Sequence, residues 1–375
     1  MQRGVKCRIY PDKEQENLIN RIFGCCRLIY NRGLDMRKEA YENGEKVGYN
    51  QTSAILTELK KQPDFEFLKE ADSVALQQSL RDLERGFVNF FEKRAGYPKF
   101  KAKHSTQTYR TINQNDKIRI VGGYIRLPKI GYVKIKQTME IGHIISATIK
   151  KTPTGKFFVV LNVDFEPEAR EIKNNSVGID VGIRDFCTFS NGEKETNPEH
   201  IKKNLKKLRR EQTRLSKKQK GSNNYGKQRI RVATVHENVS NQRNDFLQKL
   251  STRLISENQT ICLEDISVKD IITETQNSEA CRKQKRNMNR SQYDVSWAEF
   301  FRMLEYKAKW YGNTIIKVPS DYPSSRICHS CGEQHEKLNP KIRKWKCTDC
   351  GETHDRDINA AINILNKGLA IKAIS

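Results

Sequence analysis

The sequence lacks the features that mark several large classes of protein. No stretch approaches the roughly 20 consecutive apolar residues that a membrane-spanning helix needs, and no internal repeat is visible. The N-terminal segment, MQRGVKCRIYPDKEQ, has no apolar core of the kind that directs secretion. We therefore exclude a membrane enzyme and a secreted disulfide scaffold, and we expect a cytoplasmic protein. Acidic residues are outnumbered, because 45 Asp and Glu stand against 69 Lys and Arg.

The excess of basic residues is the chief feature of the composition. The difference, 69 − 45, gives a formal charge of +24 in a chain of 375 residues. Binding of a polyanion explains such a charge, because each phosphate that a protein neutralises releases condensed counterions. A surface charged only for solubility is the alternative. The length allows two or three domains, each able to bury a core of its own.

Four of the ten cysteines form two close pairs near the C-terminus. Cys328 and Cys331 make one C-x2-C motif, and Cys347 and Cys350 make another after fifteen intervening residues. Two such pairs on a short hairpin can surround a Zn²⁺ ion with four thiolates. Disulfide pairing is the alternative, and a reducing cytosol argues against it. Because four protein ligands leave no open position, this zinc would be structural. The other six cysteines are expected to be small buried residues or inert thiols.

The N-terminal half divides into a helical and a β-rich region. Residues 12–104 predict helices, one of which begins after Asp72 and repeats apolar residues at steps of three and four. Residues 117–165 predict two β-hairpins, the first turning at Gly122 and Gly123. Several short strands with turn signals favour a small barrel, which a strand near residues 5–10 could complete.

Between these regions, residues 93–110 interleave cations with aromatic rings. Lys99, Lys101 and Lys103 lie close to Tyr97 and Phe100 in this segment. Cations beside exposed rings suit a nucleic-acid strand, by pairing with phosphates and stacking on bases. An ordinary basic linker with inward-facing aromatics explains the pattern equally well.

Residues 202–220 hold ten Lys and Arg but only one acid, Glu211. Apolar residues at helical spacing predict that this segment is one arm of a long basic helical hairpin. The hairpin could be merely well solvated, or it could bind a nucleic-acid backbone.

Three acids occupy comparable places in the predicted C-terminal half. Asp180 and Glu264 each end an apolar strand, and Asp357 opens a helix. Carboxylates gathered at one edge of a sheet repel each other unless hard cations such as Mg²⁺ or Mn²⁺ neutralise them. Two such ions about 3.5–4 Å apart can activate water and stabilise the leaving oxygen in phosphodiester hydrolysis. Asp265 competes with Glu264 for this role, and Asp355 competes with Asp357 or caps the helix. The set of three acids in a basic protein favours a metal-dependent nuclease.

The sequence resembles the TnpB family, also called OrfB transposases, which bacterial insertion sequences encode. The matching stretches, in the family's order from about residue 8 to residue 366, are RIYPDKEQ, FGCCRLIYNRGL, SLRDLERGFVNFF, GYPKFKAK, LPKIGYVKI, VGIDVGIRDF, CLEDI, PSSRICHSCG and CTDCGETHDRDINAAINI. The resemblance implies an α+β multidomain protein with a RuvC-like nuclease of the RNase H fold, a zinc ribbon inserted in it, and a wedge β-barrel carrying an inserted helical recognition lobe. The implied boundaries are 1–12 and 105–172 for the wedge barrel, 13–104 for the recognition lobe, 173–321 and 353–375 for the nuclease, and 322–352 for the zinc ribbon, which would bind target nucleic acid.

The resemblance also implies an activity. Family members are similar to type V CRISPR effectors: they bind a guide RNA derived from the transposon end and cut DNA that pairs with it beside a short transposon-adjacent motif. Base pairing then reads the sequence, while the protein reads the shape of the heteroduplex and the short motif. We expect one chain on one RNA, cytoplasmic and associated with the nucleoid when on DNA, with no membrane partner.

The family's site residues carry over position by position. The catalytic acids, which would hold two Mg²⁺ ions with Mn²⁺ as an alternative, carry over onto Asp180 in GID, Glu264 in LED and Asp357 in RDINAA. The zinc ligands carry over onto Cys328, Cys331, Cys347 and Cys350, and the residues facing the adjacent DNA motif onto Tyr49, Gln77 and Asn115. Two other functions stay open: an RNA-guided repressor without nuclease activity, in which one or more carboxylates should be lost, and a transposase that acts directly on DNA ends.

Overall fold

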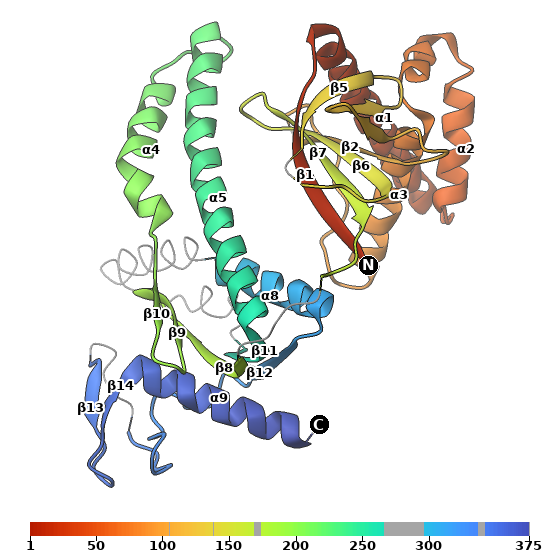
Figure 1. Cartoon of the computed structure of the whole chain (residues 1–375). Coiled ribbons are helices and arrows are strands. Elements are labelled where there is room, and N and C mark those ends of the chain that lie inside the picture. Colours follow the sequence, from red (N-terminus) through yellow and green to blue (C-terminus); the bar gives the residue numbers. More distant parts are fainter. Residues whose placement is uncertain (105, 138, 169–173, 266–295, 337–341, 375) are drawn as a thin grey trace. The chain divides into compact units, whose positions relative to one another are not determined.

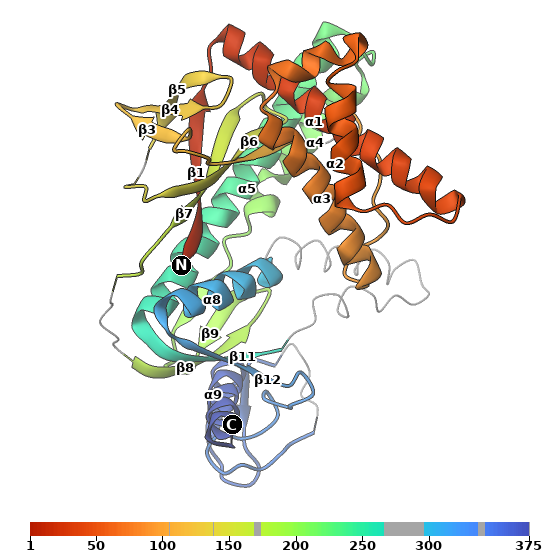
Figure 2. The same ribbon diagram turned by 90° about the vertical axis from the view of Figure 1, so that its right-hand side faces the viewer.

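The structure is a computed structural model, shown in Figure 1 and, turned by 90°, in Figure 2. It describes residues 1–375 apart from 105, 138, 169–173, 266–295, 337–341 and 375. The chain forms two compact units, Met1–Glu166 and Pro167–Ser375, which we describe separately. Within the described residues, no helix combines the length and the apolar character that crossing a bilayer would need.

The N-terminal unit is built on a curled sheet of seven antiparallel strands in the order β2-β6-β7-β1-β5-β4-β3. The strands are β1 (Gln2–Tyr10), β2 (Gln107–Ile112), β3 (Arg119–Val121), β4 (Tyr124–Leu127), β5 (Gly131–Lys136), β6 (Ile144–Lys151) and β7 (Phe157–Asp164). Both predicted hairpins are confirmed, and β1 joins them between β7 and β5. Among the described strands β2 and β3 are the two edges, so the closed barrel stays a prediction.

Helices cover one face of this sheet. They are α1 (Lys13–Glu42), α2 (Tyr49–Leu59), the 3-10 helix η1 (Pro63–Glu70) and α3 (Ser73–Phe91). The carboxylate of Asp72 accepts a hydrogen bond from the backbone N–H of Val74, which confirms the predicted N-cap of α3. Phe23 of α1 meets Tyr109 of β2 edge to face, with ring centroids 5.7 Å apart, in the core between helices and sheet.

The C-terminal unit has a five-stranded mixed sheet in the order β10-β9-β8-β11-β12. The strands are β8 (Asn174–Val181), β9 (Asp185–Phe189), β10 (Lys194–Thr196), β11 (Asn258–Glu264) and β12 (Thr314–Val318). The first three are antiparallel and follow one another through short turns, whereas β11 and β12 run parallel to β8. Parallel strands end at the same edge of a sheet, so β8 and β11 bring their C-terminal residues together.

Helices lie on both faces of this second sheet (Figure 1). On one face lie α5 (Asn223–Glu257) and α8 (Trp297–Tyr311), and on the other lies α9 (Arg356–Ile374), while α4 (His200–Ser216) packs against α5. Side chains alternate along a strand, so Ile179 and Leu263 pack with α5 and α8, while Cys262 packs with α9. A two-stranded hairpin of β13 (Lys344–Lys346) and β14 (Thr353–Asp355) leads directly into α9.

The backbone of α9 approaches the central strands unusually closely because two glycines leave room for it. A Cβ atom added to Gly178 of β8 would lie 2.1 Å from the carbonyl oxygen of Ala361, and one added to Gly368 of α9 would lie 2.4 Å from the sulfur of Cys262. Both distances are far below van der Waals contact. Close approach of backbones is a known reason for glycine inside a strand, and here it determines how near the N-terminus of α9 lies to the sheet.

We expect Gly178→Ala to lower the free energy of unfolding by about 2 kcal/mol or more, because its methyl group would force α9 away from β8. Thermal and denaturant unfolding would measure the change. Gly226→Ala is the matched control, since Gly226 lies in α5 with no atom within 4 Å of an added Cβ, and alanine favours a helix by about 0.8–1 kcal/mol. Equal stability of Gly178→Ala and the wild-type protein would show that α9 does not depend on this contact.

Candidate active site

Asp180 and Glu264 are neighbours across the parallel pair β8 and β11. Ile179 lies opposite Leu263 in the register, so the two acids follow at the same level, one residue further along each strand. Two residues earlier, Gly178 and Cys262 both face α9. Because side chains two apart lie on one face of a strand, both carboxylates face the side of the sheet on which α9 packs.

Asp357 comes from the first turn of α9 on that same side. Burial, followed by the negative charges of Asp357 and Glu264, raises the pKa of Asp180 to about 8, although Arg356 and Arg343 oppose the shift. Burial also raises the pKa of Glu264. The fold therefore gathers three acids that are far apart in the sequence closely enough for two of them to affect the protonation of the third.

The trio is nevertheless less compact than the cysteine cluster described below. Within the described part of the chain, groups of three or more ligand atoms that all lie within 4.8 Å of one another do not include these three carboxylates together. Asp357 is instead held by cations: Nη1 of Arg343 lies 2.8 and 3.0 Å from its two oxygens, and Nζ of Lys194 lies 3.9 Å away. A divalent cation would have to compete with both. Desolvated carboxylates that repel each other are nonetheless a donor set that suits a hard cation.

The structure also separates each acid from its competitor in the sequence. Asp355 caps α9, since its Oδ1 accepts hydrogen bonds from the backbone N–H groups of Asp357 and Ile358, at 3.0 and 3.2 Å. The side chain of Asp265 is 62% exposed and lies 3.8 Å from Nζ of Lys317. Asp357 and Glu264, not Asp355 and Asp265, thus accompany Asp180.

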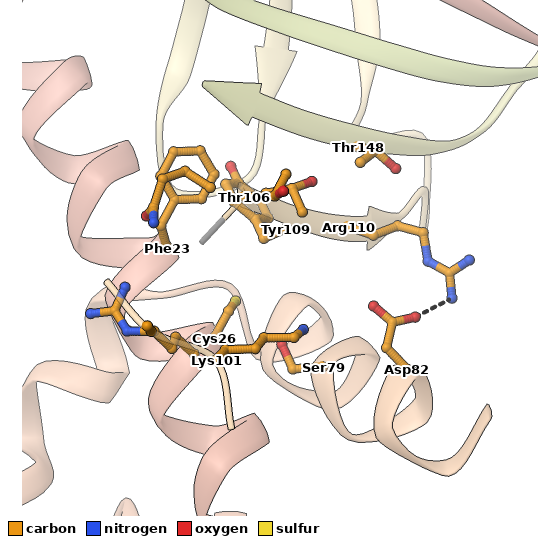
Figure 3. Close-up of a pocket in the computed structure, with 13 residues that line it drawn as sticks. Phe23, Cys26, Ser79, Asp82, Lys101, Thr106, Tyr109, Arg110 and Thr148 are labelled. Carbon is orange, nitrogen blue, oxygen red and sulfur yellow. Dashed lines mark ion pairs between the residues drawn. The ribbon is translucent and has the colours of Figure 1, made fainter. Parts of the chain in front are cut away.

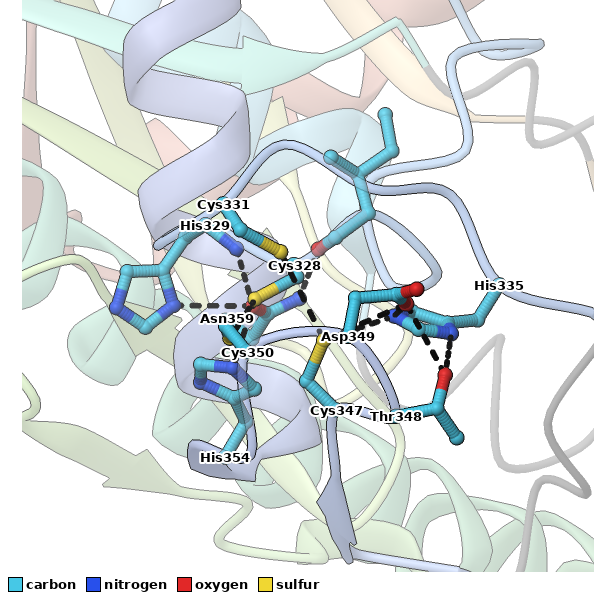
Figure 4. Close-up of polar contacts among 11 residues, drawn as sticks. Cys328, His329, Cys331, His335, Cys347, Thr348, Asp349, Cys350, His354 and Asn359 are labelled. Carbon is cyan, nitrogen blue, oxygen red and sulfur yellow. Dashed lines mark hydrogen bonds and ion pairs between the residues drawn. The ribbon is translucent and has the colours of Figure 1, made fainter.

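The four predicted cysteines come together where Cys347 and Cys350, at the turn of the β13–β14 hairpin, meet Cys328 and Cys331 of the preceding segment (Figure 4). Their sulfur atoms all lie within 4.8 Å of one another, with 3.6 Å between Cys328 and Cys350 and 3.7 Å between Cys331 and Cys347. A tetrahedral site with Zn–S bonds of about 2.3 Å requires about 3.8 Å between sulfurs, whereas a disulfide requires about 2.0 Å. The spacing therefore fits a four-thiolate metal centre and not a pair of disulfides.

Backbone amides prepare two of these sulfurs to be thiolates. Burial alone would raise the pKa of Cys328, but the N–H groups of Cys331 and Ser330 bring it down to about 7. The N–H of Cys350 is the main cause of the lowered pKa of Cys347. The glycines that follow each pair, Gly332 and Gly351, have φ values of 81° and 75°, a conformation that only glycine adopts without strain. Five of the other cysteines are buried, as expected, and Cys281 lies outside the described residues.

Histidines lie next to the four cysteines but are not part of the four-sulfur cluster. Nε2 of His354 lies 3.1 Å from the sulfur of Cys328, and Nε2 of His335 lies 3.2 Å from that of Cys347. Two further groups of close ligand atoms result, His329 with Glu352 and His354, and His335 with Cys347 and Asp349. An imidazole N–H at this distance can donate to a metal-bound thiolate and so reduce its charge.

Four residues that shape this region were not among the predicted site residues. Lys194 pairs with Asp355 at 2.8 Å, and Arg343 pairs with Asp357, but no sequence signal distinguishes them from the many other cations. Asn359 and Asn363 are buried in α9, only 1% and 3% exposed. Two asparagines four apart on the buried face of a helix were a signal available in the sequence.

The remaining predicted site residues lie in the N-terminal unit or on the basic hairpin. Gln77 in α3 and Asn115, with a φ of 52° in the β2–β3 turn, are exposed, and Tyr49 at the start of α2 lies under Arg81, 4.8 Å from its ring. On α4 and just beyond it, all ten cations of residues 202–220 are exposed, whereas Glu211 is buried and bonds to Gln228 of α5. The basic helical hairpin is thereby confirmed as a cationic surface.

The segment 93–110 has exposed cations and rings, as expected for a nucleic-acid contact, and also a part that packs inward, as expected for an ordinary linker. Lys99 and Lys103 are exposed, as are the rings of Tyr97 and Phe100. Lys101 is different: it lines a cavity of about 180 Å³ together with Cys26 and Tyr109 (Figure 3). Its Nζ lies 3.9 Å from the centroid of the Tyr30 ring, and burial lowers its pKa. This lysine is therefore part of the interior of the unit more than of its surface.

Three family profiles match the chain. Residues 158–275 match a family described as a probable transposase of the OrfB, IS605 type. Residues 297–364, which include α8, the four cysteines and the first nine residues of α9, match the TNB domain of Cas12f1-like proteins. Residues 1–46 match a profile described as a helix-turn-helix domain, although here they form one strand and one 30-residue helix.

The chain is also similar to whole proteins. It is 38% identical to the "Putative RNA-guided DNA endonuclease" of Streptomyces pristinaespiralis, over 100% of this chain and 91% of that protein. It is 33% identical to "Putative RNA-guided DNA endonuclease InsQ" of Escherichia coli K12, over 99% of this chain and 93% of that one. Among solved structures, the chain of a Cas12f1–sgRNA–target DNA complex aligns with a TM-score of 0.59 at 13% identity, over 97% and 98% of the two chains. That likeness shows a shared fold.

The raised pKa of Asp180 predicts how stability depends on pH without divalent cations. The group binds a proton more tightly in the folded protein, where its pKa is about 8, than in the unfolded chain, where it is about 4. Its contribution is therefore complete below pH 4 and is lost as the pH rises to about 8. We expect Asp180→Asn to be more stable than the wild-type protein at pH 8, by about 2 kcal/mol or more, and similar to it at pH 4.

Denaturant unfolding at several pH values would measure this difference. Asp265→Asn is the matched control, because Asp265 is the acid next to Glu264 in the chain and its side chain is 62% exposed. A constant difference between Asp180→Asn and the wild-type protein from pH 4 to pH 8 would contradict the assignment of the shift to Asp180.

The cysteine cluster predicts one tightly bound zinc ion per chain. We expect Cys328→Ser to lose this zinc and several kcal/mol of stability, because the binding free energy of a structural metal contributes directly to folding. Elemental analysis and thermal unfolding would measure both effects. Cys7→Ala, which changes a buried cysteine of the N-terminal unit, should keep its zinc. Zinc retained at full stoichiometry in Cys328→Ser would contradict the assignment.

Proposed function

Because the chain belongs to the TnpB (OrfB) family, we propose that it is an RNA-guided DNA endonuclease. It binds a guide RNA derived from the end of its transposon and cuts complementary DNA beside a short transposon-adjacent motif. The observation that carries this proposal is the convergence of Asp180, Glu264 and Asp357, where burial and then the charges of the other two acids raise the pKa of Asp180. Relatives with 38% and 33% identity over nearly their whole length carry names of the same activity.

The three acids would hold two divalent cations, Mg²⁺ or alternatively Mn²⁺. When bound, such ions activate water for attack and stabilise the leaving oxygen of a phosphodiester. Asp180 and Glu264 are pre-positioned by adjacent strands, so the sheet itself holds these two ligands in place. Asp355 orients the first turn of α9 by capping it, and Arg343 and Lys194 neutralise Asp357 as long as no ion is present. The four cysteines would hold a structural Zn²⁺.

The domain boundaries belong to the same proposal. The five-stranded sheet, with three antiparallel strands followed by two parallel ones, supports a RuvC-like nuclease of the RNase H fold over residues 173–321 and 353–375. The hairpin with the cysteines supports a zinc ribbon at 322–352, which would bind target nucleic acid. The curled sheet and helices of the N-terminal unit support a wedge barrel at 1–12 and 105–172, with a recognition lobe at 13–104.

Several exposed groups are suited to contact nucleic acid. The cations of α4 form a continuous run that can neutralise phosphates of a guide–target duplex. In the N-terminal unit, Gln77 and Asn115 are exposed polar groups that can bond to base edges, and Tyr49 can join them; these would read the adjacent motif. Lys99 and Lys103 would bind the backbone. One chain on one guide RNA, acting in the cytoplasm where the nucleoid lies, completes the proposal.

We expect Asp180→Ala and Glu264→Ala each to reduce cleavage by at least about a hundredfold, since each removes a ligand of the divalent cations. Binding of guide RNA and matched DNA should stay nearly unchanged, because it depends on other surfaces. Asp265→Ala is the matched control, with an exposed acid beside Glu264 that faces Lys317; this variant should cleave normally. Cleavage of guide-matched DNA with Mg²⁺, together with filter binding, would measure both properties.

The same assay separates the alternatives. Guided binding without cleavage by the wild-type protein would indicate a repressor without nuclease activity. Joined DNA ends that form without guide RNA would indicate a transposase acting directly. Unchanged cleavage by Asp180→Ala would remove the acids from the mechanism altogether.

A further inference from the structure

Two buried asparagines of α9 hold the segment that carries the first zinc-site cysteine. The side-chain amide of Asn363 donates to the backbone carbonyls of Ile327 at 2.6 Å and of Ser324 at 2.8 Å. The amide of Asn359 donates to the same two carbonyls, at 2.7 and 3.4 Å. An asparagine amide has two donor hydrogens, so each of these side chains is used fully as a donor.

Asn359 also bonds to the residue on the other side of Cys328. Its Oδ1 accepts from the backbone N–H of His329 at 3.0 Å and lies 3.0 Å from Nδ1 of the same histidine (Figure 4). The backbone is thus held at Ile327 and at His329, immediately before and after Cys328. Both asparagines are almost completely buried, so water cannot replace the hydrogen bonds that either amide makes.

The same helix begins with the third acid. Asp357 lies two residues before Asn359, within one helical turn. The hairpin β13–β14, which carries the second pair of cysteines at its turn, enters α9 directly, and its other end bears Arg343, which bonds to Asp357. His354, the middle residue of β14, lies 3.1 Å from the sulfur of Cys328. The first cysteine pair is therefore tied to α9 from the side, and the second pair is tied to its start.

We propose that Asn359 and Asn363 are positioning residues that couple the four-cysteine centre to Asp357, so that zinc occupancy of this centre strengthens divalent-cation binding by the acids. Zinc links the two cysteine pairs, and the asparagines transmit the resulting geometry to α9. Without zinc, the hairpin loses its link to residues 324–329 and the start of α9 loses one of its supports. This inference rests on the proposed role of the acids as cation ligands.

Binding of Mn²⁺ to the full-length protein, followed by electron paramagnetic resonance, tests the coupling without requiring cleavage. The site is identified as the Mn²⁺ site that Asp180→Ala abolishes. We expect Asn359→Leu and Asn363→Leu each to weaken this binding about tenfold or more. Loss of a residue that orients metal ligands without touching the metal has an effect of this size. Asn366→Leu is the matched control on the same helix, since Asn366 is exposed, and its Mn²⁺ affinity should equal that of the wild-type protein.

Removal of zinc from the wild-type protein should weaken Mn²⁺ binding by a similar factor. By reciprocity, saturating Mn²⁺ should strengthen zinc binding by the same factor. In cleavage assays, the Asn variants should need a higher Mg²⁺ concentration for half-maximal rate and should recover at saturating Mg²⁺. A variant that is merely less stable would lose maximal rate instead, with no change in the Mg²⁺ concentration required.

Asn359→Asp and Asn363→Asp provide a second pair of variants if the leucine variants fail to fold. They keep the size of the side chain but replace the donor amide by an oxygen that repels the carbonyls. Unchanged Mn²⁺ affinity in zinc-free protein, or in zinc-loaded Asn variants, would overturn the coupling. If the wild-type protein does not cleave but Mn²⁺ affinity follows zinc, the coupling stands and the proposed endonuclease function fails.

Discussion

The contact between α9 and the centre of the second sheet is the constraint on which the candidate site depends. Backbone and Cβ atoms approach so closely that neither Gly178 nor Gly368 has room for a side chain. This contact sets the height of the helix above β8 and β11, and therefore the distance from Asp357 to the two strand-end acids. A larger residue at either glycine would not only cost packing energy. It would also move the third carboxylate away from the other two.

The two candidate metal centres differ in the protonation state that they favour when no metal is bound. At the cysteine centre, backbone amides point at the sulfurs of Cys328 and Cys347 and lower the pKa of these two thiols before any metal is bound. At the acids, burial and mutual repulsion instead favour a proton on Asp180, and Arg343 and Lys194 neutralise Asp357. The first centre is thus suited to a permanently bound ion. The second is suited to exchangeable divalent ions, which would displace the proton of Asp180 and compete with Arg343 and Lys194 for Asp357.

Local patterns allowed much of the architecture to be predicted. Both β-hairpins, the cap at Asp72 and the pairing of the cysteines depend on residues close together in the chain, and all were found where expected. The competition between Glu264 and Asp265 could not be decided in this way. Which of two adjacent acids faces inward depends on the register of a parallel pair whose partner strand lies about 80 residues earlier.

The sequence by itself determined the chemistry that the protein holds: an excess of cations, four thiolates at zinc spacing, and three acids at the ends of predicted elements. Only the tertiary structure decided how these groups meet. It made Asp355 the cap of α9, placed Lys101 in the lining of a cavity, and linked Asn359 to the backbone around Cys328. The physical reason is that the chemical type of a side chain is a property of the residue alone. Burial, distance and hydrogen-bond partners arise only when distant segments pack together.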